Sequence, residues 1–164
     1  SVTLSIPNLE WIDPILTRVL EWEQSRRVQH PSGHEVIVYS MDGGGPNKEV
    51  WVIVEPDKGG ARQGAGAVHH VAFRVSDFDE QKYWNTRVNS SGLRTSGYVD
   101  RFWFKSIYFR ISNGILFEIA TDGPGFGVDE DMETLGEKLI LPPFLEARRT
   151  QIESNLKPIV VHKA

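Results

Sequence analysis

The 164-residue sequence contains no cysteine. Disulfide bonds and thiolate chemistry are therefore excluded, and a bound metal would have to be held by histidine and carboxylate side chains. No hydrophobic run approaches the roughly 20 residues that span a bilayer, and nothing at the N-terminus is typical of a signal peptide. We therefore expect one compact domain in the cytoplasm.

The sequence also has no strong excess of charge of either sign. Lysine and arginine number 18 against 22 aspartate and glutamate residues, a net charge of −4. This balance offers no basic surface for nucleic acid or for a membrane. With 40% hydrophobic and 24% charged residues, the composition is that of a globular protein, which excludes disordered and fibrous classes.

The chain has no initiator methionine and begins directly in an alternating, strand-like segment at residues 2–6. An unanchored first strand frays, so we expect a piece of a longer polypeptide. The alternative is a complete short protein that has lost a methionine or a tag.

What is present is an internal repeat. In the first unit, residues 2–6 predict a strand, and Asn8 is expected to cap an amphipathic helix over residues 9–21. Two strands are predicted at residues 36–39 and 50–54, with a further strand near residues 26–29. The same order follows in a strand at 68–75, a helix opened by Asp77 and ended by Ser90-Ser91-Gly92, and strands at 101–110 and 115–120 around an Asn113-Gly114 turn. Each unit is too small to bury a core alone, so the two should pack together in an α+β fold.

This repeat divides the chain into four parts. Residues 1–57 form the first unit, 58–67 a glycine-rich linker, 68–125 the second unit, and 126–164 a C-terminal loop and helix, with the helix at about 143–156. The linker lacks the Gly-Lys-Ser/Thr ending of a phosphate loop and is read as a connector. The C-terminal helix should cover a sheet edge or a neighbouring domain.

Two of the five histidines are candidates for chemistry. His30 and His34 lie in a Pro/Gly loop and His162 in the tail, so we expect all three at the solvated surface. His69 and His70 lie in an apolar strand, where alternation should send their rings to opposite faces.

Glu118 is the second unusual residue, because it interrupts the apolar strand 114–120. A buried carboxylate is costly unless it is paired or binds a cation. His70 and Glu118 lie on the first and last strands of one unit and could face each other as half of a divalent-metal site. The structural alternative is a His–Glu ion pair without metal.

The segment Val68-His69-His70-Val71-Ala72-Phe73, together with residues 106–110 and 114–126, resembles the vicinal-oxygen-chelate superfamily. More narrowly, it resembles hydroquinone-type ring-cleaving dioxygenases of the glyoxalase/bleomycin-resistance/dioxygenase group. The resemblance implies an α+β fold of two tandem βαβββ modules followed by a C-terminal helix. It also implies a metal held by His70 and Glu118, where His70 is preferred to His69 because it directly precedes the aliphatic Val71.

The same resemblance implies a catalytic role for Tyr108, which matches the tyrosine that hydrogen-bonds the substrate oxygen in related extradiol enzymes. A packed strand aromatic is the alternative for this residue. His69, Phe104 and Phe117 are the expected substrate-binding residues, with Trp103 as a further candidate for an aromatic wall. Core packing is the alternative for each aromatic residue.

The first unit departs from this pattern. Thr3 and Ile53 stand where the second unit has His70 and Glu118, and neither is a competent iron ligand. We therefore expect the third ligand of a two-His-one-carboxylate site to come from outside this chain, from the N-terminal half of a longer protein. The isolated chain should then bind metal weakly or not at all, and should be inactive.

The sequence thus predicts the C-terminal half of a ring-cleaving dioxygenase. It would use Fe(II), with Mn(II) as the alternative metal, and would act on a catechol- or hydroquinone-type aromatic with O₂. Expected partners are the substrate, O₂ and the N-terminal half of the parent protein, with self-association into a homodimer left open. No nucleic acid and no membrane are expected. The alternatives are a glyoxalase-type isomerase, which needs more carboxylate ligands, and a metal-free, drug-sequestering module in which His70 and Glu118 only hydrogen-bond.

Overall fold

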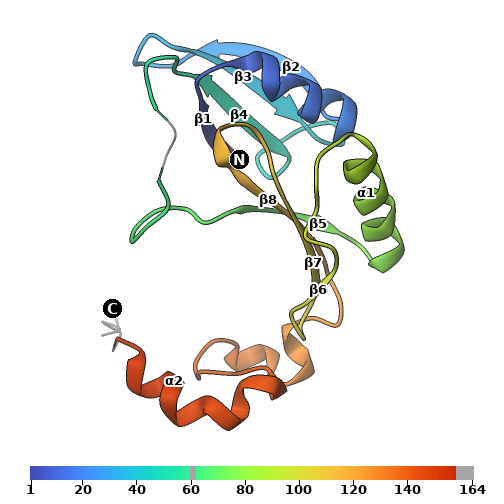
Figure 1. The fold of residues 1–164 in the computed structure, drawn as a ribbon, viewed down its shortest axis with the longest axis vertical. Coiled ribbons are helices and arrows are strands. Elements are labelled where there is room, and N and C mark those ends of the chain that lie inside the picture. The colour runs from blue at the N-terminus through green and yellow to red at the C-terminus, as the bar shows by residue number, and fades with distance from the viewer. Residues whose placement is uncertain (60–61, 158–164) are drawn as a thin grey trace.

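The computed structural model describes residues 1–59 and 62–157. It contains two four-stranded mixed sheets, with strand orders β1-β4-β3-β2 and β5-β8-β7-β6. In each sheet the first and last strands of the unit pair in parallel, while the remaining pairs are antiparallel. The predicted α+β fold of two tandem modules is therefore confirmed, and Figure 1 shows the two sheets one after the other along the long axis.

The first sheet differs from expectation in its connecting segment. Its strands are β1 (Val2–Ile6), β2 (Glu23–Gln29), β3 (Glu35–Ser40) and β4 (Glu49–Val54). The predicted helix at 9–21 is instead a 3-10 turn, η1 (Leu9–Trp11), followed by a π-helical segment, η2 (Ile15–Val19). Pro14 lies between them and has no N–H for a bond to the preceding turn, so one continuous α-helix cannot form. Asn8 does cap this segment, because its side chain accepts a bond from the backbone N–H of Glu10.

The second sheet consists of β5 (Val71–Val75), β6 (Val99–Asp100), β7 (Lys105–Arg110) and β8 (Leu116–Thr121). Asp77 caps α1 (Phe78–Ser90) as predicted. The strand predicted at 101–110 begins only at residue 105. Phe102 has a φ of 75° in a turn closed by the bond from the Arg101 N–H to the Phe104 carbonyl. The turn after β7 is the 3-10 segment η3 (Ser112–Gly114).

The C-terminal segment extends beyond the second sheet (Figure 1). Its elements are η4 (Phe126–Val128), η5 (Met132–Thr134), η6 (Pro143–Arg148) and α2 (Arg149–Asn155). The predicted C-terminal helix is therefore present, with a 3-10 first half. The last residues of the tail, like part of the predicted linker, lie outside the described residues.

The two units share one hydrophobic core. Its buried side chains come from both sheets, from η2 and from α1. Trp22 of the first unit lies against Phe73 and Phe117 of the second, with ring centroids 4.8 and 6.1 Å apart. Arg87 of α1 donates hydrogen bonds to the carbonyls of Arg18 and Val19. This packing fixes the second sheet, which carries the site described next. No helix within the described ranges is both long and apolar enough to cross a membrane.

Candidate metal centre

Glu118 lies in the middle of β8, between β5 and β7. It is directly opposite Ala72 of β5 and Tyr108 of β7 in the strand register. Only 3% of the residue is exposed, so the carboxylate needs partners to offset its lost hydration. Strand β7 and the segment before β5 supply them.

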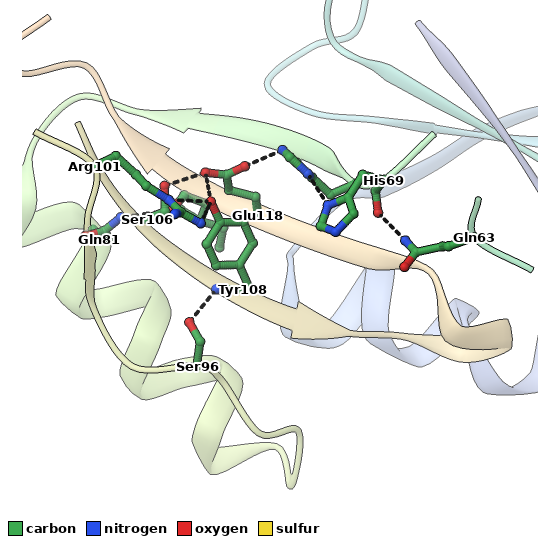
Figure 2. A network of polar contacts seen from close by, with 10 residues as sticks. Gln63, His69, Gln81, Ser96, Arg101, Ser106, Tyr108 and Glu118 are labelled. Atoms are coloured by element: carbon green, nitrogen blue, oxygen red, sulfur yellow. Dashed lines mark hydrogen bonds and ion pairs between the residues drawn. The ribbon is translucent and has the colours of Figure 1, made fainter. Parts of the chain in front are cut away.

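Each oxygen of the Glu118 carboxylate has its own partners (Figure 2). Oε1 accepts hydrogen bonds from the hydroxyls of Ser106 and Tyr108, the latter at 2.8 Å. Oε2 lies 2.6 Å from Nε2 of His70. The imidazole and the carboxylate that the sequence singled out therefore converge, 48 residues apart along the chain.

The His69-His70 pair precedes β5 and does not lie within it. Nδ1 of His69 is 2.9 Å from Nδ1 of His70, and the two rings are perpendicular. The expectation that the rings point to opposite faces is wrong, because the alternation of a strand begins only at Val71. The His69 carbonyl accepts a bond from the Gln63 side chain at 2.7 Å, which ties the pair to the segment before it.

Arg101 is a member of the site that the sequence did not indicate. Its Nη2 and Nε atoms lie 3.1 and 3.3 Å from the Tyr108 hydroxyl oxygen, and the guanidinium lies 5.3 Å from the ring centre. Arginine can only donate hydrogen bonds, so the single proton of the Tyr108 hydroxyl is directed to Glu118. The turn at Phe102 brings Arg101 back over Tyr108, and no local pattern in the sequence signals such a reversal.

The aromatic candidates lie in different places. Phe104 and Trp103 are half-buried and pack against Phe126 of the C-terminal segment, with centroids 6.0 and 5.9 Å apart. Phe117 is fully buried and packs against Phe73 and Phe109. Neighbouring residues of a strand face opposite sides, so Phe117 belongs to the core and Glu118 to the other face of β8.

The first sheet has no equivalent centre. Ile53 is opposite Ser5 there, as Glu118 is opposite Ala72, so Thr3 and Ile53 hold the positions of His70 and Glu118. Glu55, the buried carboxylate directly after β4, pairs with Lys58 and accepts a hydrogen bond from the Ser5 hydroxyl. These hydrogen bonds hold the pKa of Glu55 below its usual range.

The other histidines do not join the site. His34 lies 3.9 Å from Glu55, and His30 is exposed and contacts Ser32. His162 lies outside the described residues.

Within residues 1–59 and 62–157, no three histidine or acidic side chains form a metal-binding group. An imidazole nitrogen and a carboxylate oxygen are both ligands of divalent transition metals. The donor set of His70 and Glu118 therefore fits half of such a site.

No family model matches the chain. MhqA of Bacillus subtilis strain 168, a candidate ring-cleaving dioxygenase, is 46% identical over 159 residues, which are 96% of this chain and 50% of MhqA. The chlorohydroquinone/hydroquinone 1,2-dioxygenase of Sphingobium indicum UT26 is 35% identical over 129 residues, which are 75% of this chain and 39% of that enzyme. The chain spans half or less of the length of these curated relatives.

Solved structures give the same relationship. A candidate dioxygenase from Bacillus subtilis superposes with a TM-score of 0.81 and 36% identity, over 99% of this chain and 50% of that one. A glyoxylase/bleomycin resistance protein/dioxygenase domain from Frankia superposes with a TM-score of 0.64 over 77% of this chain and 92% of its own, at 16% identity.

The chain has the vicinal-oxygen-chelate fold. It resembles half of the ring-cleaving dioxygenases that it matches. The fold is shared with the fosfomycin resistance protein FosX of Listeria monocytogenes, solved with Mn(II), at a TM-score of 0.54 and 18% identity over 71% of this chain and 86% of FosX. The vicinal-oxygen-chelate fold therefore occurs with a bound metal in at least one other protein.

Proposed function

We propose that this chain is the C-terminal half of a metal-dependent ring-cleaving dioxygenase that acts on a catechol- or hydroquinone-type aromatic. The observation that supports this most directly is the 2.6 Å approach of His70 Nε2 to Oε2 of the buried Glu118. The likeness to half of MhqA and of the hydroquinone dioxygenase supports the reaction class.

His70 and Glu118 would be two ligands of Fe(II), or alternatively Mn(II), with the third ligand supplied from outside this chain. Such a metal, when bound, would supply Lewis-acid and redox chemistry to the substrate oxygen and to O₂. His70 must present a neutral Nε2 as a ligand. Glu118 would bring one negative charge, which partly neutralises the cation.

Tyr108 is the proposed acid–base residue. Its hydroxyl carries one proton, is held by Arg101 on one side and donates to Glu118 on the other. From this position it could hydrogen-bond a substrate oxygen and exchange a proton with it during ring opening. His69, whose ring contacts that of His70, and the half-buried Phe104 are the proposed substrate contacts.

The test is to measure iron content and O₂ uptake with methylhydroquinone for this chain and for the product of the full reading frame. We expect one iron per full-length protein and substrate-dependent O₂ uptake, with neither in the isolated 164 residues. Glu118→Gln and His70→Ala in the full-length protein should each abolish both. His30→Ala removes an exposed histidine and should change nothing. Full O₂ uptake by the Glu118→Gln protein would refute the proposal, and stoichiometric binding of the aromatic without metal would favour a sequestering module.

A further inference from the structure

Ser106 is the most deeply buried partner of the Glu118 carboxylate. The residue lies in β7 with no exposed surface, two positions before Tyr108, so both side chains are on the same face of the sheet. Its hydroxyl donates to Oε1 of Glu118, the oxygen that also accepts from Tyr108. Both hydroxyl donors are thus on one oxygen, and Oε2 is left facing His70.

We propose that Ser106 is a positioning residue that commits Glu118 to bind metal through Oε2 alone. The inference rests on the proposed function, because it concerns the same centre. A carboxylate can bind a metal through one oxygen or through both, and it can rotate to exchange them. Two hydroxyl donors on Oε1 use the lone pairs that two-oxygen binding would need. They therefore fix Oε2 as the oxygen that binds the metal, and they fix the direction in which it points.

Ser106 and Tyr108 differ in how firmly they can hold that oxygen. Tyr108 is only half-buried, and its hydroxyl also accepts hydrogen bonds from the exposed Arg101. It can therefore turn its proton to another acceptor near the site. Ser106 is fully buried, so its hydroxyl keeps donating to Glu118 even when the Tyr108 proton is turned elsewhere.

The backbone around this contact is held by Gln81 of α1. This side chain is fully buried, and its Nε2 donates to the carbonyls of Lys105 and Ile119 at 2.7 and 2.8 Å. Lys105 directly precedes Ser106, and Ile119 directly follows Glu118. Gln81 therefore clamps β7 to β8 at the level of the Ser106–Glu118 contact, which favours a rigid geometry there.

The first experiment uses the metal-free 164-residue chain and compares Ser106→Ala with the parent by NMR of the histidine ring nitrogens. In the parent, Nε2 of His70 faces Oε2, and we expect His70 to populate one tautomer, with the proton on Nε2. In Ser106→Ala the carboxylate can rotate, and we expect a mixture of tautomers. Ser40→Ala, which removes a buried serine hydroxyl from the first sheet, is the matched control and should leave the His70 signals unchanged. Unchanged His70 signals in Ser106→Ala would overturn the inference.

The second experiment measures Fe(II) affinity in the full-length protein. Loss of a partner that orients a metal ligand typically costs 10–100-fold in affinity, so we expect Ser106→Ala to bind about 10-fold more weakly or worse, and Ser106→Thr, which keeps the hydroxyl, to recover most of the loss. If Glu118→Gln retains the metal, the proposed function itself fails. If Glu118→Gln loses the metal but Ser106→Ala binds as tightly as the parent, only the role of Ser106 fails.

Discussion

At the scale of single residues, the site could be predicted where a side chain contradicts its surroundings. Glu118 stands in an apolar strand, so its cost of burial alone required a partner, and His70 is that partner. Ser106 and Arg101 gave no such signal, because a serine in a strand and an arginine near a turn are ordinary. Their roles depend on strand register and on the reversal at Phe102, which only the folded chain shows.

Outside the site, Glu49 is a residue whose charge should make the stability of the protein depend on pH. Arg26 binds both of its oxygens, at 2.7 and 2.9 Å, and the Trp51 indole donates to it at 3.0 Å. These bonds, chiefly the one from Arg26, lower the pKa of Glu49 to about 2 from an ordinary value of 4.5. A folded-state pKa below the unfolded one stabilises the protein above the unfolded pKa, and this stabilisation is lost as the pH falls through the folded value.

We therefore expect Glu49→Gln to unfold at a lower urea concentration than the parent at pH 7. The difference should persist down to about pH 4.5, the ordinary pKa, and should close as the pH falls from there to about 2. Urea titrations at pH 7, 5, 4, 3 and 2, followed by circular dichroism, measure both midpoints. A difference that stays constant over the whole range would contradict the assigned role of the Glu49 charge.

At the scale of secondary-structure elements, prediction succeeded where one local pattern decided the outcome. Asp77 at the start of α1 and the apolar runs of β3 and β4 are such cases. The segment at 9–21 has helical spacing, but Pro14 removes one backbone donor and the result is η1 and η2. Strand β2 is mostly polar and exposed, so it lacks the alternating apolar residues that predict a strand, and only residues 26–29 of it were predicted.

The cap of α1 makes a testable contribution to stability. The Asp77 side chain accepts a hydrogen bond from the backbone N–H of Glu80 at 2.9 Å, and Glu80 in turn accepts one from the N–H of Ser76 at 2.8 Å. Removing an N-cap side chain costs about 0.5–2 kcal/mol, so Asp77→Ala should lower the free energy of unfolding by about 1 kcal/mol. Asp77→Asn keeps an acceptor and should stay close to the parent in the same urea titration. Equal losses in both variants would show that charge, and not capping, is what Asp77 supplies.

At the scale of the whole molecule, the repeat in the sequence predicted two sheets, and the limited area of each predicted that they share a core. The shared core is observed, and it includes Trp22 between the two units. The pattern could not reveal how the units join, because Trp22 lies in a connecting segment whose contacts are distant in sequence.

The joint between the units can be tested at Trp22. This side chain is 8% exposed and lies against Phe73 and Phe117 of the second sheet, whereas Trp11 in the same connecting segment is 73% exposed. Truncating a buried tryptophan costs about 3–5 kcal/mol, and truncating an exposed one about 0.5 or less. Trp22→Ala should therefore lose most of the stability of both sheets together, while Trp11→Ala should unfold like the parent.

Urea unfolding followed by amide hydrogen exchange reports on the two sheets separately. In the parent we expect amides of β4 and β8 to become exposed in one cooperative transition. In Trp22→Ala both sets should lose protection to a similar extent, because neither sheet buries enough surface alone. If only the amides of the first sheet lose protection, the two units are independently stable and the shared core is not what holds the second sheet in place.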